Sequence, residues 1–318
     1  MRDDFDTVPV RPPLGESELE LRERLRRHVD ALAGVIGPRH MDAPGTLETA
    51  ANYIERELAA VAGETVVRHR FPVGNEWAEN LLVERRGTQR PERVIVVGAH
   101  YDTVPETPGA DDNASAVAML IEAARVLAGR DAKYTLRFLA PANEEAPHYE
   151  LGTMGSDHYA RHCAAEQGTR VVGMLSLEMV GYYRTGPGSQ ALPEALPRVA
   201  RHVFPNRGDF LAAVANMRSI PLLLRFWRGF RRSRPRFPIF PVALPEAVRD
   251  ITRSDHRAFW AFGIPALMIT DTSYLRNPHY HQPTDTPDTL DYDRLTRATL
   301  GVAGGIGRLA GIRQAVVW

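Results

Sequence analysis

Acidic and imidazole side chains follow three short apolar runs of this sequence. His100 and Asp102 come after "VIVVGA", Glu144 and Glu145 come after "LRFLAPAN", and Glu178 follows "VVGMLSL". Unbroken apolar runs of this length are typical of strands that are buried on both faces of a parallel sheet. Ligands of open α/β sheets bind beyond the carboxyl ends of the strands. We therefore expect these five side chains to meet at one edge of a sheet.

Two further segments add candidates. Asp111 and Asp112 lie in the turn "PGADDNAS", and His279, Tyr280 and His281 lie in "NPHYHQPTDTPDTL". Taken alone, an aspartate at the start of a helix is usually an N-cap, and a lone histidine is usually a hydrogen-bonded loop residue. Taken together, several carboxylates at one rim would repel each other, because each raises the cost of ionising the next. A divalent metal centre is the simplest arrangement that makes such a cluster stable.

The types of the candidate ligands restrict the metal. Imidazoles with carboxylates and no thiolate suit zinc best, with manganese or cobalt possible, and they argue against a calcium cage. Five candidate ligands exceed one tetrahedral zinc but suit two metal ions, roughly 3.5–4 Å apart, that share a bridging carboxylate. In the pair Glu144–Glu145, one glutamate would then bind metal while its neighbour takes a proton from metal-held water.

The elements that must position these residues alternate between strands and helices. Helical patterns cover "SELELRERLRRHVDALAG", with a capping box of Ser17 and Glu20, and residues 46–62, which stop at Gly63. Strand-like runs at 65–71, 80–84, 93–100, 134–140, 171–178 and 263–271 are interleaved with helical segments. This alternation predicts an α/β fold with three α/β/α layers and a mixed, mostly parallel central sheet.

Two stretches do not follow the alternation. We expect residues 1–16 to form a flexible tail, and residues 17–318 to form a single domain with an insertion or lid at about 183–250. The basic and aromatic run "LLLRFWRGFRRSRPRFPIF" lies in that insertion. A nucleic-acid patch is the alternative interpretation of this run, but a charged surface face is the more common outcome.

Composition excludes several classes of protein. The chain has 318 residues, a formal net charge of zero and one cysteine, Cys163, so no internal disulfide can form. Zero net charge gives no overall attraction to nucleic acid or to an anionic membrane. No apolar run approaches the roughly 18 residues that cross a bilayer. The first residues lack the apolar core of a signal peptide. We therefore expect a cytoplasmic protein, or a secreted one if a leader has been removed.

Six motifs occur in an order that resembles a known family. They are "HYDT", "GADDNAS", "NEE", "LEMVGYY", "SDHRAFWAFGIPALMITDT" and "YHQPTDTPDTLDYDRL". The series resembles the co-catalytic di-zinc aminopeptidases of the bacterial secreted type, in a group that also holds glutamate carboxypeptidases and glutaminyl cyclases. The resemblance covers roughly residues 45–182 and 250–312, and it implies the zinc exopeptidase fold.

The resemblance implies a role for each motif residue. The metal ligands would be His100, Asp112, Glu145, Glu178 and His281, with Asp112 bridging two zinc ions and followed by a cis peptide. Relatives often carry aspartate in place of Glu178. Asp102 would orient the His100 ring, Glu144 would be the general base, and Tyr280 would stabilise the oxyanion. Ser254–His256 marks a place near the substrate, so we expect Asp255 to contact it. His279 is the main rival of His281.

The implied function is that of a zinc-dependent exopeptidase, most simply an aminopeptidase acting on a peptide or aminoacyl substrate. The aromatic-rich 183–250 region suggests a hydrophobic first residue. A glutaminyl cyclase-type zinc acyltransferase is one alternative. A carboxypeptidase or aminoacylase is another, and it would need a basic pocket that the arginines between 225 and 236 could supply. A non-catalytic binding module of this fold would usually have lost ligands, and here all are present.

Overall fold

The structure is a computed structural model that describes residues 12–196, 199, 202–233 and 235–313. Within this part, one sheet has the strand order β1-β2-β4-β3-β5-β8-β6-β7. The strands are β1 Val67–Val73, β2 Glu76–Arg85, β3 Arg90–Gly98, β4 Tyr134–Ala140, β5 Arg170–Glu178, β6 Leu211–Ala215, β7 Ile239–Ala243 and β8 Ala266–Thr270. The central strands β4, β3, β5 and β8 run parallel to one another. β1 and β2 join antiparallel at one side, and β6 joins β8 antiparallel at the other.

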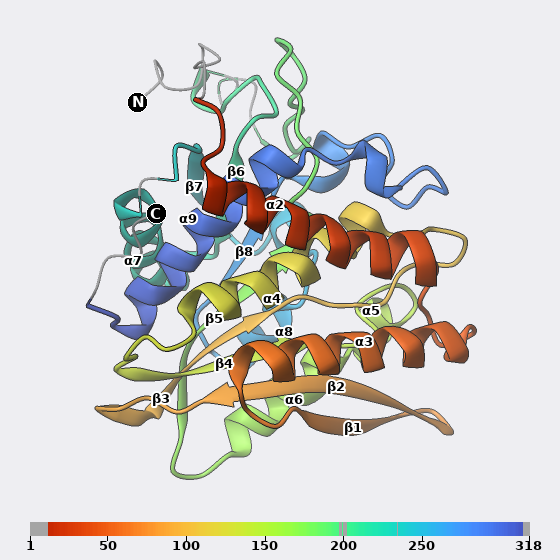
Figure 1. Cartoon of the computed structure of the whole chain (residues 1–318), viewed down its shortest axis with the longest axis vertical. Helices are drawn as coiled ribbons and strands as arrows, with labels where there is room; N and C mark the ends of the chain where they lie inside the picture. Colours follow the sequence, from red (N-terminus) through yellow and green to blue (C-terminus); the bar gives the residue numbers. More distant parts are fainter. Residues whose placement is uncertain (1–11, 197–198, 200–201, 234, 314–318) are drawn as a thin grey trace.

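Helices cover both faces of this sheet (Figure 1). One face carries α2 Glu16–Val29, α3 Pro44–Ala62, α4 Ala116–Leu127, α7 Ile220–Arg232 and α9 Tyr292–Ala310. The other face carries α6 Gly155–Ala165 and α8 His256–Ala261, with the short α5 His148–Leu151 nearby. The predicted fold class, a three-layer α/β/α arrangement with a mixed and mostly parallel sheet, is confirmed.

The core explains why the central strands are apolar at consecutive positions. On β3, Val94 and Val96 pack with α6 and α8, whereas Ile95 and Val97 pack with the helices of the opposite layer. Side chains of a strand alternate between the two faces, so a strand covered on both faces needs apolar residues throughout. This arrangement places the carboxyl ends of the central strands at one open edge.

The N-terminal helix begins differently from the prediction. α2 starts at Glu16, and the Glu18 carboxylate accepts a 2.8 Å hydrogen bond from the Gly15 N–H. The predicted capping box of Ser17 and Glu20 is therefore wrong, because Ser17 already lies inside the first turn. Of the predicted tail, residues 1–11 lie outside the described residues. α3 ends at Ala62, with Gly63 in the left-handed conformation, as predicted.

The stretch 183–250 also differs from expectation. Residues 211–243 continue the alternation as β6, α7 and β7, and they extend the main sheet at the side of β8. Five-residue strands are too short to give a clear period, and the arginines of α7 lie on its exposed side. The described residues between 184 and 210 are mostly irregular, and several of them line the cavity described below. Among the helices of the described residues, none combines the length and the apolar character needed to cross a membrane.

Candidate metal centre

The carboxyl ends of three parallel strands bring the predicted residues together. His100 lies two residues beyond the end of β3, Glu144 and Glu145 follow β4, and Glu178 is the last residue of β5. These four side chains are buried at the open edge of the sheet. Two loops complete the group. Asp112 comes from the short helical segment Ala110–Ser115 before α4, and His281 comes from the connection between β8 and α9.

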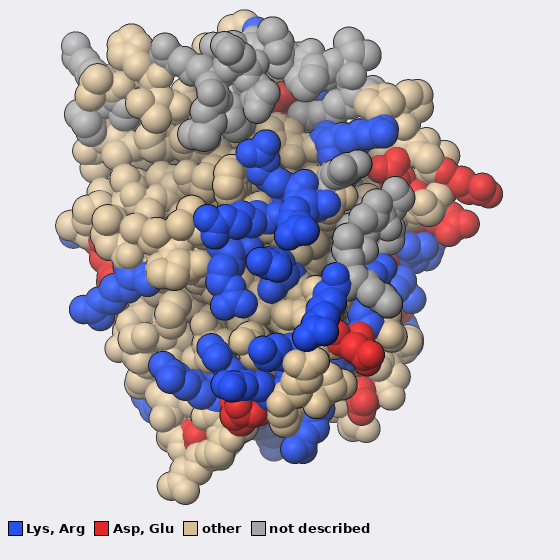
Figure 2. Space-filling view, turned by 90° about the vertical axis from the view of Figure 1, so that its left-hand side faces the viewer, with Lys and Arg blue, Asp and Glu red and all other residues tan. Residues whose placement is uncertain are grey.

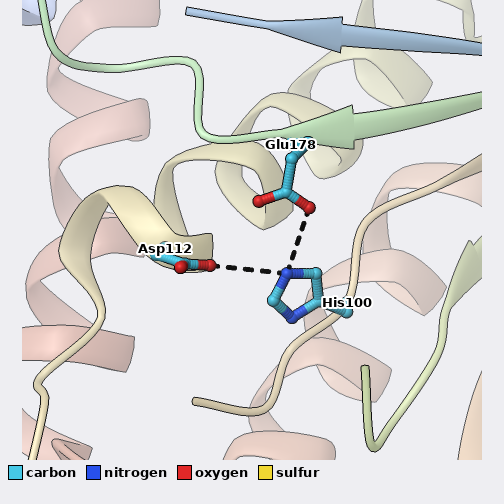
Figure 3. A group of neighbouring side chains, drawn as sticks. All are labelled: His100, Asp112 and Glu178. Atoms are coloured by element: carbon cyan, nitrogen blue, oxygen red, sulfur yellow. Dashed lines mark ion pairs between the residues drawn. The ribbon is translucent and has the colours of Figure 1, made fainter. Parts of the chain in front are cut away.

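The two oxygens of Asp112 face two different histidines. The Nε2 atom of His100 lies 3.5 Å from Asp112 Oδ1 and 3.3 Å from Glu178 Oε2, as Figure 3 shows. The Nε2 atom of His281 lies 3.2 Å from Asp112 Oδ2 and 3.2 Å from Glu145 Oε2. Each set of three residues could hold a metal ion. The geometry is therefore that of two ligand groups that share one carboxylate.

The chemistry of the donor atoms fits a pair of divalent cations. Nε2 of His100, Nε2 of His281 and Oδ1 of Asp112 are buried and have no hydrogen-bond partner among the described residues. A buried polar atom without a partner costs free energy, so such atoms rarely gather without a reason. Here they converge on the same small volume as the oxygens of Glu145 and Glu178. A cation in each group would give every one of these atoms a partner.

The protonation of the ligands leads to the same conclusion. Burial, together with the charge of Asp112, raises the pKa of Glu145 to about 7, and burial also raises the pKa of Glu178. Burial lowers the pKa of His281, but Asp112 and Glu145 outweigh it and raise this pKa to about 10. The site therefore retains protons that a divalent cation would displace on binding.

Asp102 supports both His100 and the glutamate pair. Its Oδ1 lies 3.5 Å from His100 Nδ1, in the position of an acid that orients a metal-binding imidazole. The two carboxylate oxygens also accept 3.1 Å hydrogen bonds from the backbone N–H groups of Glu144 and Glu145. Burial raises the pKa of Asp102, but these bonds and His100 lower it below its usual value. The second role was not predicted, because backbone hydrogen bonds leave no mark in the sequence.

Glu144 lies beside the candidate ligands, but it is farther from the His100 ring than Asp112 and Glu178 are. Its Oε2 is 3.9 Å from His100 Nε2, farther than the oxygens of Asp112 and Glu178. Burial raises the pKa of Glu144 well above its usual range. Its carboxyl group lines the cavity, where it can reach a water molecule or a substrate. A third possible ligand set, His100 with Glu144 and Glu145, also exists.

The segment around Tyr280 distinguishes the two rival histidines. His281 points to Asp112 and Glu145, whereas the His279 ring lies 2.9 Å, through Nδ1, from Thr284 Oγ1. The Tyr280 ring stacks on His281, with centroids 3.7 Å apart, and lines the cavity. The peptide bond between Asp112 and Asn113 is cis, as the resemblance implied.

Ser254 and Asp255 have different positions from those expected. Asp255 is fully buried and does not line the cavity, so it is not placed to contact a substrate, and the expectation of direct contact is corrected. It precedes α8, and burial raises its pKa to about 7. Its neighbour Ser254 donates a 2.8 Å hydrogen bond to Glu178 Oε2. Through Ser254, the motif therefore supports the candidate ligand Glu178.

Two further buried residues position the loops and were not predicted. The Arg39 side chain donates to the backbone carbonyls of Tyr101, Pro108 and Gly109, and burial lowers its pKa to about 10. The Asp285 carboxylate accepts from the backbone N–H of Asp112 at 3.0 Å. Asp285 lies within the motif "YHQPTDTPDTLDYDRL", which could have drawn attention to it. Arg39 lies in no motif, so no signal in the sequence indicates its role.

A cavity of about 550 Å³ opens beside the metal centre. Its lining includes the cluster of Asp112, Glu144, Glu145, Glu178, Tyr280 and His281. Many of the other lining residues are apolar, among them Phe204, Phe210, Val214, Phe240 and Met268. Two arginines, Arg249 and Arg253, also line it. The described arginines between 225 and 236 do not line it, so they do not form the basic pocket that was expected from this stretch.

Comparison with known proteins agrees with this site. Residues 80–210 and 242–304 match the profile of peptidase family M28. The uncharacterized protein YfbL of Escherichia coli (strain K12) is 35% identical over 289 residues, which are 88% of this chain and 86% of that protein. Other curated relatives, named as aminopeptidases or zinc metalloproteases, are longer, and the chain spans between 23% and 59% of their length.

Solved structures show the same fold. A zinc aminopeptidase from Bacillus subtilis superposes with a TM-score of 0.68 at 16% identity, covering 91% of this chain and 95% of that one. A glutaminyl cyclase from Fimbriiglobus ruber gives a TM-score of 0.66 at 20% identity, covering 96% and 97%. These findings confirm the resemblance that the six motifs indicated. The chain belongs to peptidase family M28.

Proposed function

We propose that this protein is a zinc-dependent aminopeptidase that removes an apolar residue from the N-terminus of a peptide. The observation that carries the proposal is the shared carboxylate. Asp112 faces His100 with one oxygen and His281 with the other, so the chain offers two adjacent ligand groups. In such centres, two zinc ions lower the pKa of a bound water and stabilise the attacking and developing oxygens.

The chain's own residues supply the proton transfer. The Glu144 carboxylate borders the cavity and would accept a proton from the attacking water, then deliver it to the leaving amine. Burial raises its pKa toward the working range of a general base. The Tyr280 hydroxyl, held by a 3.3 Å hydrogen bond from Arg253 Nη2, would stabilise the developing oxyanion.

The residues that line the cavity support a preference for the N-terminus of a peptide and for an apolar first side chain. The α-amino group of a peptide is largely protonated near neutral pH. With Asp112, Glu145 and Glu178 holding metal, the free α-amine would bind a metal ion as the neutral amine or pair with the Glu144 carboxylate, whereas apolar lining residues such as Phe204 and Phe240 favour a large hydrophobic side chain. We therefore expect leucine or phenylalanine anilides to be cleaved faster than those of lysine or glutamate.

The adjacent glutamates provide a matched test of the mechanism. Glu144→Gln should retain the zinc content of the wild type but lower kcat by about two to four orders of magnitude. This variant removes the general base but leaves all the proposed metal ligands in place. Glu145→Gln should lose zinc as well as activity. Zinc per chain by elemental analysis, measured beside kcat on leucine anilide, separates the two. A fully active Glu144→Gln enzyme would remove the assignment of the base.

The glutaminyl cyclase alternative rests on the shared fold. Phe204, Phe210 and Phe240 of the cavity wall favour an apolar side chain, whereas Gln190, Thr270 and Thr272 could bond a glutamine carboxamide. Release of pyroglutamate from a Gln-peptide, without cleavage of leucine anilide, would favour the cyclase over the aminopeptidase. Cleavage of acyl-amino acids is the other outcome to measure, because Arg253 at the cavity could bind a substrate carboxylate.

A further inference from the structure

The exposed side of α7 is strongly basic. Arg225, Arg228, Arg231 and Arg232 are all exposed, and the helix contains no acidic residue. Exposed Arg218 precedes the helix, and exposed Arg308 of α9 lies beside it. None of these arginines forms an ion pair with a described residue, in contrast to Arg22, Arg68 and Arg137 elsewhere on the molecule. Figure 2 shows Lys and Arg gathered on the side of the molecule where Figure 1 places α7.

Helical spacing makes these residues one continuous surface. Arg225, Arg228 and Arg232 are separated by three and four residues, which places them on the same side of the helix. The opposite side carries Phe226 and Phe230, which pack against α9. We call the exposed residues Arg218, Arg225, Arg228, Arg231, Arg232 and Arg308 the α7 basic face. It concentrates positive charge on a protein whose formal net charge is zero.

Exposed apolar side chains lie among these arginines. Met217 is 56% exposed and Leu224 is 39% exposed. Trp227 is half-buried, and the Arg231 guanidinium lies over its ring at 5.0 Å. Arginine combined with tryptophan and aliphatic side chains on one exposed helix surface is characteristic of helices that bind the interface of an anionic membrane. Purely electrostatic binding of a polyphosphate would leave Met217 and Leu224 without a role.

The α7 basic face and the cavity lie on opposite faces of the sheet. Ala212, Val214 and Phe240 point to the cavity, whereas Leu211 and Ala213 pack in the core that contains α7. This follows from the alternation of side chains along β6 and β7. A protein bound through α7 would therefore keep its cavity open to soluble substrate.

We propose that the α7 basic face docks this protein on membranes that contain anionic phospholipid. The arginines contact the headgroup phosphates, and Met217, Leu224 and Trp227 enter the interfacial layer. No bilayer-spanning segment is required for this mode of binding. Because the face is remote from the metal centre, the proposal stands independently of the proposed peptidase activity.

Co-sedimentation with vesicles tests the proposal. The full chain should bind phosphatidylcholine vesicles that contain phosphatidylglycerol, but not vesicles of phosphatidylcholine alone, and binding should weaken as salt is added. The triple variant Arg225→Glu/Arg228→Glu/Arg232→Glu should lose at least about tenfold in partition coefficient, since each basic residue near the surface contributes to adsorption. Its activity on leucine anilide should equal that of the wild type.

A matched variant controls for net charge. Arg27, Arg56 and Arg70 are exposed on α2, α3 and β1. Their reversal to glutamate changes net charge equally and should lower binding much less. Equal loss in both triple variants would show a general charge effect and overturn the proposal. Absence of binding to anionic vesicles would also overturn the proposal. Displacement of the protein from vesicles by double-stranded DNA at equal phosphate would overturn it too, because nucleic acid would then be the preferred partner.

A second variant tests the apolar contribution. Leu224→Ser should weaken binding to anionic vesicles at moderate salt, where electrostatic attraction is screened, and leave the salt-dependent part unchanged. An unchanged partition coefficient would contradict insertion of the apolar side chains.

Discussion

At the scale of single residues, the site is organised by a carboxylate with two partners. Asp112 directs its oxygens to His100 and His281, which lie 181 positions apart in the chain. The backbone N–H of Asp112 donates a hydrogen bond to Asp285. Asp102 accepts a hydrogen bond from the backbone of Glu145, and Ser254 donates one to Glu178. Four of the five candidate ligands, His100, Asp112, Glu145 and Glu178, therefore have a second residue that holds their side chain or backbone, which is the usual way to orient a metal site.

The two neighbouring histidines give a residue-scale prediction. His281→Ala should lower zinc content from about two ions toward one per chain and reduce kcat by more than about a hundredfold, because a direct ligand is lost and even supporting residues contribute ten- to hundredfold to metal affinity. His279→Ala should change neither quantity, since its ring bonds Thr284. Elemental analysis and anilide hydrolysis measure both. Equal zinc loss in the two variants would contradict the assignment of His281.

Most of the candidate ligands could be predicted from sequence because each is attached to a strand end or a recognisable motif. His100, Glu144, Glu145 and Glu178 follow unbroken apolar runs, and the position of such runs in a parallel sheet fixes where their next residues lie. Ser254 and Arg39 could not be assigned this way. Their roles are hydrogen bonds to a ligand and to loop carbonyls, and these depend on contacts between segments distant in sequence.

At the scale of elements, the helices around the site are joined by buried polar contacts as well as by apolar packing. Glu122 of α4 is fully buried and accepts from Arg24 at 2.7 Å and from Arg125 at 2.9 Å, and it lies 3.2 Å from His28. Arg24 and His28 belong to α2, so this carboxylate connects two helices of one layer. Burial raises the pKa of Glu122, but the three partners outweigh burial and lower this pKa to about 2.

The depressed pKa of Glu122 predicts a loss of stability in acid. The group contributes stability that is fully present above its ordinary pKa of 4.5, and that is lost as pH falls toward about 2. The shift corresponds to about 3 kcal/mol of unfolding free energy. Urea unfolding between these pH values should therefore show a steeper decline for the wild type than for Glu122→Gln.

A neighbouring glutamate serves as the control for this measurement. Glu20 is exposed on α2 and lies 3.9 Å from Arg24, so its removal should cost at most about 1 kcal/mol and leave the pH dependence nearly unchanged. If the free energy of unfolding fell equally with pH in Glu122→Gln and in the wild type, the Glu122 carboxylate would not be ionised and bonded as described.

The elements themselves differ in how far sequence could predict them. β3, β4, β5 and the helix α3 have strong patterns, and they occur close to where they were expected. β6 and β7 were missed because each strand has only five residues. α7 does carry a recognisable amphipathic pattern, apolar on one side and arginine-rich on the other, and the basic run obscured it.

At the scale of the whole molecule, the α7 basic face and the carboxylates of the cavity lie on different surfaces, although their charges cancel in the net charge of the chain. A formal net charge of zero predicted no preference for anionic partners, yet the α7 basic face gathers six exposed arginines on one side. The cavity and its carboxylates lie across the sheet from that face. A net charge is a sum over the surface, so it cannot report such segregation. The two proposed activities, peptide cleavage and membrane docking, can therefore be tested separately.

The central claim is that Asp112 is shared by two metal ions. Crystals grown with zinc and measured on both sides of the zinc absorption edge test it most directly. Two anomalous peaks are expected roughly 3.5–4 Å apart, one beside His100 and the other beside His281, with an oxygen of Asp112 facing each. A single peak, or peaks that do not contact Asp112, would contradict the account.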